Sequence, residues 1–115
     1  MFDAVDFYHL AAKLHREGTP AAIRTSIGRA YYAVFLVARD KAKITDTGKG
    51  VHNNVAEYYT QRNSKVSNQL KSCKMLRHIA DYKLDKPLTN RDSGNVLREA
   101  REILVYFGIT GLPTK

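Results

Sequence analysis

The segment from Pro20 to Lys43 is the feature of the sequence that most restricts the fold. Its apolar residues recur at three- and four-residue steps, which is the spacing of an α-helix, and they cover most of the helix circumference. Thr19 and Pro20 provide an N-cap and a first-turn proline. A helix that is apolar on most sides needs neighbours on several sides, so this segment is predicted to be the central helix of an all-α protein. The main stripe consists of Ile23, Ile27, Ala30, Tyr31, Val34 and Ala38, widened by Ala33, Phe35 and Val37.

Four further segments show helical periodicity, and no segment alternates as a strand would. Their approximate ranges are 2–18, 52–61, 64–82 and 89–108. Gly18 and Gly108 suit helix C-caps, and the connections are short. Short connections favour antiparallel neighbours, so we expect an antiparallel four- to five-helix bundle that forms one domain over residues 1–115. The stripe predicted for the first helix is Ala4, Phe7, Leu10, Ala11 and Leu14.

The net charge of +8 is unevenly distributed along the chain. No acidic residue occurs between Glu57 and Asp81, whereas five cations do: Arg62, Lys65, Lys71, Lys74 and Arg77. A basic surface attracts a polyanion, although a solvated face that maintains solubility explains the same pattern. If the partner is RNA, we expect Lys71 and Lys74 to contact phosphates, together with Arg29 and Tyr32 on the polar side of the central helix.

The remaining composition excludes several classes of protein. Cys73 is the only cysteine, so the chain has no internal disulfide framework, and the longest apolar run, 30–38, is too short to cross a bilayer. The first residues carry acids where a secretory signal carries positive charge. We therefore expect a cytoplasmic protein without membrane contact. Histidines, cysteines and acids do not occur at metal-ligand spacing, so no metal or cofactor is expected.

A polar cluster is predicted near the end of the helix at 64–82. Arg77 falls at the edge of that helix's apolar stripe, and an arginine is rarely buried without a partner. Asp81 lies one turn further on and can pair with it, while His78 and Tyr82 lie one turn apart on the adjoining face. The cluster is either an ion pair that ends the helix or a site where Arg77 holds a phosphate. In the second case His78, Asp81 or Tyr82 would orient groups or move protons, with His78 the better acid–base candidate.

A second pattern on the same helix is an apolar strip that points away from its core face. Met75, Ile79 and Tyr82 follow one another at four- and three-residue steps. Such a strip indicates either packing by the loop after the helix or a subunit interface. In a homodimer, two copies of the polar cluster could meet across a twofold axis.

Two stretches of the sequence resemble the HEPN family of small helical-bundle proteins. Residues 23–35, IRTSIGRAYYAVF, are similar to the Ser/Gly-Arg-Ala-Tyr-Tyr-Ala-x-Phe run of one HEPN branch, and residues 76–82, LRHIADY, to its Arg-x-x-Ala-Asp-Tyr segment. The resemblance implies a bundle of this kind and several functions. Many HEPN proteins are metal-independent endoribonucleases whose active site lies at a dimer interface. Others form a toxin–antitoxin pair with a minimal nucleotidyltransferase, or bind RNA or nucleotides without cleavage.

Matched to the family's nuclease motif, Arg77 takes the place of the arginine and His78 that of the polar residue after it. Tyr82 falls where the first permitted histidine would stand, and no histidine follows His78. Two hypotheses result. The chain is a HEPN-type endoribonuclease of a toxin–antitoxin or defence-like system, acting as a homodimer, or it is a non-catalytic module that binds RNA, nucleotides or a minimal nucleotidyltransferase. A purely structural helical adaptor leaves the position of Arg77 unexplained.

Overall fold

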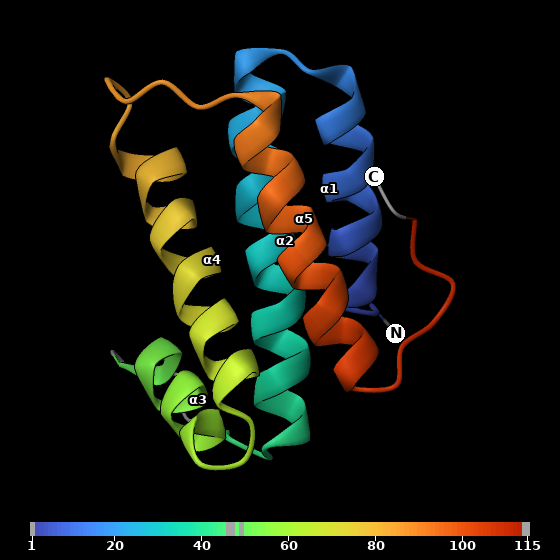
Figure 1. The fold of residues 1–115 in the computed structure, drawn as a ribbon, viewed down its shortest axis with the longest axis vertical. Coiled ribbons are helices and arrows are strands. Elements are labelled where there is room, and N and C mark those ends of the chain that lie inside the picture. The colour runs from blue at the N-terminus through green and yellow to red at the C-terminus, as the bar shows by residue number, and fades with distance from the viewer. Residues whose placement is uncertain (1, 46–47, 49, 114–115) are drawn as a thin grey trace.

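The computed structural model describes residues 2–45, 48 and 50–113. These residues form five α-helices and no β-strand, which confirms the predicted all-α class (Figure 1). The helices are α1 (Val5–Glu17), α2 (Pro20–Lys41), α3 (Val51–Thr60), α4 (Ser64–Tyr82) and α5 (Asn90–Tyr106). In Figure 1, α1 and α4 run upward whereas α2 and α5 run downward, and the short α3 lies beside the lower end of α4. No helix among the described residues is both long enough and apolar enough to span a membrane.

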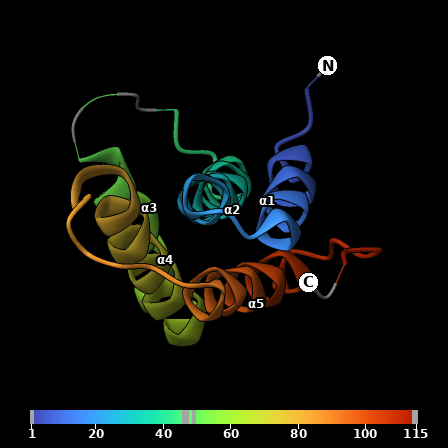
Figure 2. The same cartoon turned by 90° about the horizontal axis from the view of Figure 1, so that it is seen from above.

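Helix α2 is the centre of the bundle, as its apolar pattern predicts. Twelve of its 22 residues are buried, and it contacts all of the other helices. Seen from above, α2 lies between α1 on one side and α3 and α4 on the other, and α5 lies along the lower edge of the view between α4 and α1 (Figure 2). A residue on α2 can therefore contact α1, α3 or α4, depending on the face it occupies.

The helix ends follow local capping chemistry. The Thr19 hydroxyl accepts a hydrogen bond from the backbone N–H of Ala22 at 3.2 Å, which confirms the predicted N-cap of α2. Two predicted boundaries are wrong. Helix α1 begins at Val5 rather than near residue 2, because the Asp3 carboxylate accepts from the Val5 N–H at 2.9 Å and holds the turn before it. Helix α2 ends two residues before Lys43, which has a φ of +58° that a right-handed helix cannot accommodate.

The buried face of α1 differs from the predicted stripe. Leu10 is 41% exposed, whereas Tyr8, Ala11 and Ala12 are buried. The alanines allow α1 to approach α2 so closely that the Ser26 hydroxyl of α2 donates to the Ala11 carbonyl at 2.7 Å. Tyr8 is buried because the C-terminal segment covers it, and its hydroxyl donates to the Pro113 carbonyl at 2.9 Å. The prediction for Leu10 is wrong, and the burial of Tyr8, which the predicted stripe omits, depends on a covering segment far away in the sequence.

Candidate functional site

Arg77 and Asp81 form the predicted ion pair on α4. The Arg77 side chain is 21% exposed, and its Nε lies 3.0 Å from Oδ2 of Asp81. Nε is buried and its N–H is not directed at that oxygen, so the contact is an ion pair without a hydrogen bond. Neither terminal amino group of Arg77 has a hydrogen-bond partner among the described residues, and neither is enclosed. The pair therefore holds the guanidinium in place and leaves N–H donors for a ligand.

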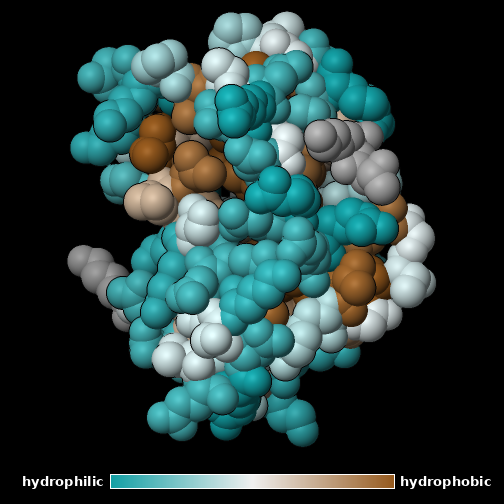
Figure 3. Space-filling model, in the orientation of Figure 1, coloured by the Kyte–Doolittle hydropathy of each residue, from teal (hydrophilic) through white to brown (hydrophobic). Residues whose placement is uncertain are grey.

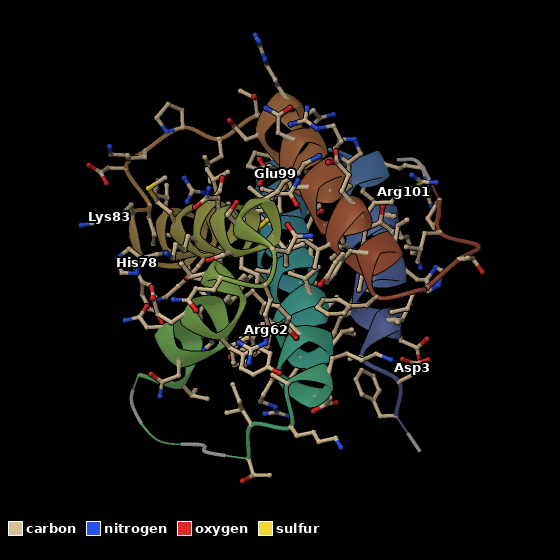
Figure 4. All side chains as sticks on the ribbon, turned by 60° about the horizontal axis from the view of Figure 1, so that its bottom comes forward. Asp3, Arg62, His78, Lys83, Glu99 and Arg101 are labelled. Carbon is tan, nitrogen blue, oxygen red and sulfur yellow. The ribbon has the colours of Figure 1, made fainter. Side chains whose placement is uncertain are left out.

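Aromatic rings from two helices flank this guanidinium. The Arg77 Cζ lies 5.6 Å from the ring centroid of Tyr32 on α2 and 5.7 Å from that of Tyr82 on α4. Both distances lie within the range of cation–π attraction. Tyr82 is 63% exposed and its ring contacts His78 at 5.1 Å between centroids. His78 itself lies on the outer side of α4, facing solvent (Figure 4).

Tyr32 joins a second arginine to the cluster. The Cζ of Arg29 lies 5.1 Å from the Tyr32 centroid and 5.0 Å from that of Phe7 on α1. Arg29 and Tyr32 are both half-buried. Two guanidinium groups thus contact one tyrosine ring, which places the predicted phosphate contacts Arg29 and Tyr32 beside Arg77.

The short helix α3 brings a histidine to the same cluster. His52 stacks on Phe35 of α2, with ring centroids 4.1 Å apart and an interplanar angle of 20°. Its Nδ1 lies 2.6 Å from the hydroxyl of Tyr31. Burial lowers the pKa of His52 below its ordinary value, and the nearby positive charges of Lys74 and Arg77 lower it further. His52 is therefore neutral at neutral pH and lies within the electrostatic reach of both cations.

Two hydrogen bonds hold α3 in the position that presents His52. The Tyr59 hydroxyl donates to the Ala38 carbonyl of α2 at 2.7 Å, and the Ser67 hydroxyl of α4 donates to the Ala56 carbonyl at 2.9 Å. Burial raises the pKa of Tyr59 to about 12, so this phenol stays protonated and able to donate. The position of His52 is thus fixed from α2 and α4 together.

A hollow of about 410 Å³ lies between α3 and α4 next to this cluster, lined by Asn53, Lys71, Lys74, Met75 and His78. Lys74 Nζ donates to Asn53 Oδ1 at 2.7 Å, and Lys71 Nζ lies 3.2 Å from Glu57 Oε1. The two predicted phosphate-binding lysines therefore line one hollow and are loosely tethered to α3. The exposed Lys71–Glu57 ion pair contributes little to stability, and Lys74 is held by one hydrogen bond to a neutral amide, so both ammonium groups can exchange partners.

Arg24 has a structural position that its sequence pattern did not reveal. Instead of facing solvent, its guanidinium donates to carbonyls at the C-terminal end of α4, including Ala80 at 3.0 Å and Ile79 at 3.3 Å. It also donates to the carbonyls of residues 83, 84 and 86 in the following loop. Arg24 thus caps the turn that carries Asp81 and Tyr82.

The predicted interface strip lies on the outer side of α4. Met75 is 61% exposed, Tyr82 is exposed, and Ile79 is half-buried. Leu84, in the loop after α4, extends the strip and is exposed as well. Figure 3 shows apolar side chains gathered over the second half of α4 and this loop. The loop does not cover the strip, which removes one of the two explanations for it.

Sequence reasoning missed His52 and the hydroxyl of Tyr31. Tyr31 is a core residue, as its place in the apolar stripe of the central helix predicts, and it is 2% exposed. The described residues contain no group of histidine, cysteine and acidic side chains that could hold a metal. Comparisons with models of protein families, with curated proteins and with solved structures find no match for this chain. The fold is an all-α helical bundle, and the resemblance to HEPN proteins rests on the two stretches at 23–35 and 76–82.

Proposed function

We propose that the protein binds RNA, with Arg77 as the anchor for a backbone phosphate. The observation that carries this proposal is a guanidinium fixed by Asp81 whose terminal amino groups have no hydrogen-bond partner among residues 2–45, 48 and 50–113. Planar guanidinium donors match a phosphate in geometry and charge. Lys74 and Lys71 line the adjoining hollow, and Arg29 lies on the far side of Tyr32. RNA would thus follow a basic path over α4 toward α2.

The aromatic side chains support RNA rather than a simple anion as the ligand. Tyr82 is well exposed and Tyr32 half-buried, and both contact the Arg77 guanidinium. Exposed aromatic rings beside cations provide stacking surfaces for bases of single-stranded nucleic acid. We expect single-stranded RNA to bind with the phosphate on Arg77 and a base against Tyr82.

Cleavage of the bound RNA without a metal is the second candidate function. It is favoured by the contact between His78 and Tyr82, because an imidazole, which can both accept and donate a proton, then lies close to the Arg77 site. In this reaction His78 takes the proton of the ribose 2′-hydroxyl, and the 2′-oxygen attacks phosphorus. The bond from phosphorus to the 5′-oxygen breaks, and the departing oxygen receives the proton from His78, so that the products are a 2′,3′-cyclic phosphate and a 5′-hydroxyl. Arg77 stabilises the developing charge, and Asp81 keeps Arg77 in place. From the resemblance to HEPN proteins we also propose that the protein works in a cytoplasmic toxin–antitoxin or defence-like system. Its partner there would be a minimal nucleotidyltransferase.

We also propose that the strip of Met75, Ile79 and Tyr82 is a homodimer interface. Large exposed apolar side chains in one continuous patch are characteristic of interaction surfaces. Because Tyr82 belongs both to the strip and to the Arg77 cluster, a twofold contact here would bring two clusters together.

The test uses purified protein, a fluorescently labelled single-stranded RNA and excess chelator. We expect binding that weakens steeply as salt rises, and a loss of at least about tenfold in affinity for Arg77→Ala. Arg98→Ala removes an exposed arginine on α5 and serves as the matched control. Equal affinity in both variants, with helicity retained by circular dichroism, would refute the proposal. The same samples on a denaturing gel report cleavage, which Arg77→Ala should abolish along with any growth inhibition on expression.

A further inference from the structure

The pair formed by Tyr31 and His52 determines which nitrogen of the imidazole carries the proton. Tyr31 is 2% exposed, and among the described residues its hydroxyl has one hydrogen-bond partner, Nδ1 of His52 at 2.6 Å. A buried phenolic O–H needs an acceptor, because an unsatisfied buried donor is costly. Burial also raises the pKa of Tyr31, so the phenol keeps its proton. Tyr31 is therefore the donor and Nδ1 the acceptor.

A neutral imidazole that accepts at Nδ1 carries its proton at Nε2. The groups that face His52 favour the neutral form. From α2 these are the uncharged phenols of Tyr31 and Tyr32, and from α4 the cations of Lys74 and Arg77. Two nearby cations and partial burial oppose a second proton. His52 is thus a neutral side chain with one N–H donor at Nε2.

That donor is directed away from the protein interior. The two nitrogens of an imidazole point in divergent directions, so Nε2 points away from Tyr31. Nε2 makes no hydrogen bond within the part of the chain that the structure describes, and it is not enclosed. The stacking on Phe35 fixes the plane of the ring. A preorganised N–H donor is therefore present within electrostatic reach of Lys74 and Arg77.

We infer that His52 is a further RNA contact, a neutral Nε2–H donor to an oxygen of the phosphate that Arg77 binds. The inference rests on the proposed RNA-binding function and deepens it. It also assigns His52 a role opposite to that of a proton acceptor, since an Nε2 that already carries hydrogen has no lone pair to offer. Any proton transfer in RNA cleavage would then fall to another group, and His52 contributes recognition.

The protonation state is tested first, in the free protein. Two-bond ¹H–¹⁵N correlation spectra of uniformly ¹⁵N-labelled protein distinguish the two neutral tautomers of each histidine, with His52→Gln used to assign the His52 signals. We expect His52 to be protonated at Nε2 alone at neutral pH. A proton on Nδ1, or a doubly protonated ring, overturns the inference without reference to RNA.

The second test measures RNA affinity with the same labelled RNA. His52→Ala should weaken binding about tenfold, because it removes a hydrogen bond to a charged group. His52→Gln retains an N–H donor and should stay within about threefold of the unmodified protein. Full affinity in His52→Ala, alongside a loss in Arg77→Ala, would overturn this inference and leave the proposed function intact. Unchanged binding in Arg77→Ala would instead overturn the proposed function.

The third test measures how RNA affinity depends on pH, because a histidine with only a structural role would not produce the dependence expected here. All variants carry His78→Gln, which removes the exposed histidine that contacts Tyr82. With Tyr31 present, RNA affinity should change little as the pH falls from about 8 to the ordinary histidine pKa of about 6.5, since the pKa of His52 is lowered. In Tyr31→Phe the imidazole loses the donor that favours its neutral form, and affinity should rise as the pH falls. A rise of equal size with Tyr31 present would contradict the inference.

Discussion

The guanidinium of Arg24 on α2 donates to the carbonyl of Ala80 in the last turn of α4, at 3.0 Å. This contact joins the central helix to the turn that carries the Arg77 partner Asp81. The last carbonyls of a helix have no intrahelical donors, and a cation near them is further stabilised by the helix dipole. Arg24 thus supports the candidate site without being free to bind RNA itself.

Arg24→Ala should lower the free energy of unfolding by about 1 to 3 kcal/mol, because several carbonyls lose a charged donor together. Arg24→Lys should recover only part of this loss, since one ammonium cannot match the fork of a guanidinium. Urea denaturation followed by circular dichroism measures both. Arg91→Ala, at an exposed position on α5, is the control. If Arg24→Ala is as stable as this control, the capping role is wrong.

Gly28 lies where α2 passes Asp81. A Cβ added to Gly28 would lie 3.7 Å from Asp81 Oδ1, an ordinary van der Waals contact. Gly28→Ala should therefore stabilise the protein by about 0.5 to 1 kcal/mol, the difference between alanine and glycine inside a helix, and leave RNA binding unchanged. Gly28→Leu should collide with the Asp81 carboxylate and weaken both stability and RNA binding. Thermal unfolding of the two variants separates these outcomes, and destabilisation by alanine would show that the helices pack more closely here.

His52 predicts a specific dependence of stability on pH. Its pKa in the folded protein is lowered, so in the window just below its unfolded value of about 6.5 the unfolded chain binds more protons. The contribution of His52 to the free energy of unfolding is fully present above its pKa in the unfolded chain. It is lost as the pH falls through its pKa in the folded protein. Stability should therefore decrease between about pH 7 and about pH 5 more steeply than in His52→Gln. Parallel curves in urea denaturation would contradict the lowered pKa.

Met75→Glu tests the proposed homodimer interface. A carboxylate within a buried apolar strip costs several kcal/mol in the dimer and nothing in a monomer, where residue 75 is exposed. Sedimentation equilibrium should show the unmodified protein as a dimer and Met75→Glu as a monomer of unchanged helicity. Arg98→Glu reverses a charge on α5 outside the strip and should remain dimeric. A monomeric unmodified protein at high concentration would eliminate the interface.

Lys71 and Lys74 predict a change in the salt dependence of RNA binding. Each lysine that neutralises a phosphate of a single strand releases about 0.7 counterions. In Lys71→Gln/Lys74→Gln the slope of log affinity against log salt should therefore become shallower by about 1.4, twice that value. Lys83→Gln and Lys86→Gln together remove two exposed charges from the α4–α5 loop as the control. An unchanged slope would place the RNA path elsewhere.

The local parts of the fold and site follow from the sequence, whereas the contacts between distant segments do not. The periodicity of α2 predicts its central place, and the four-residue spacing of Arg77 and Asp81 predicts their pairing, since helix geometry alone determines both. The position of His52 depends on how α3 folds back after the polar stretch at 42–50, where no periodicity constrains the chain. Arg24 illustrates the same limit, because its contacts depend on the course of the loop at 83–89.

The hydroxyl of Tyr31 also determines whether His52 could act as a base. The hydrogen-bond partner of Nδ1 determines whether Nε2 of an imidazole donates or accepts a hydrogen bond. In His52 that partner is the buried phenol of Tyr31. Exchanging it for a residue that accepts from Nδ1 would leave a lone pair at Nε2 beside Arg77, with no change at the exterior. A single interior substitution would thereby change His52 from a hydrogen-bond donor to the phosphate into a proton acceptor. Two proteins with the same surface residues would then differ in the chemistry available at this site.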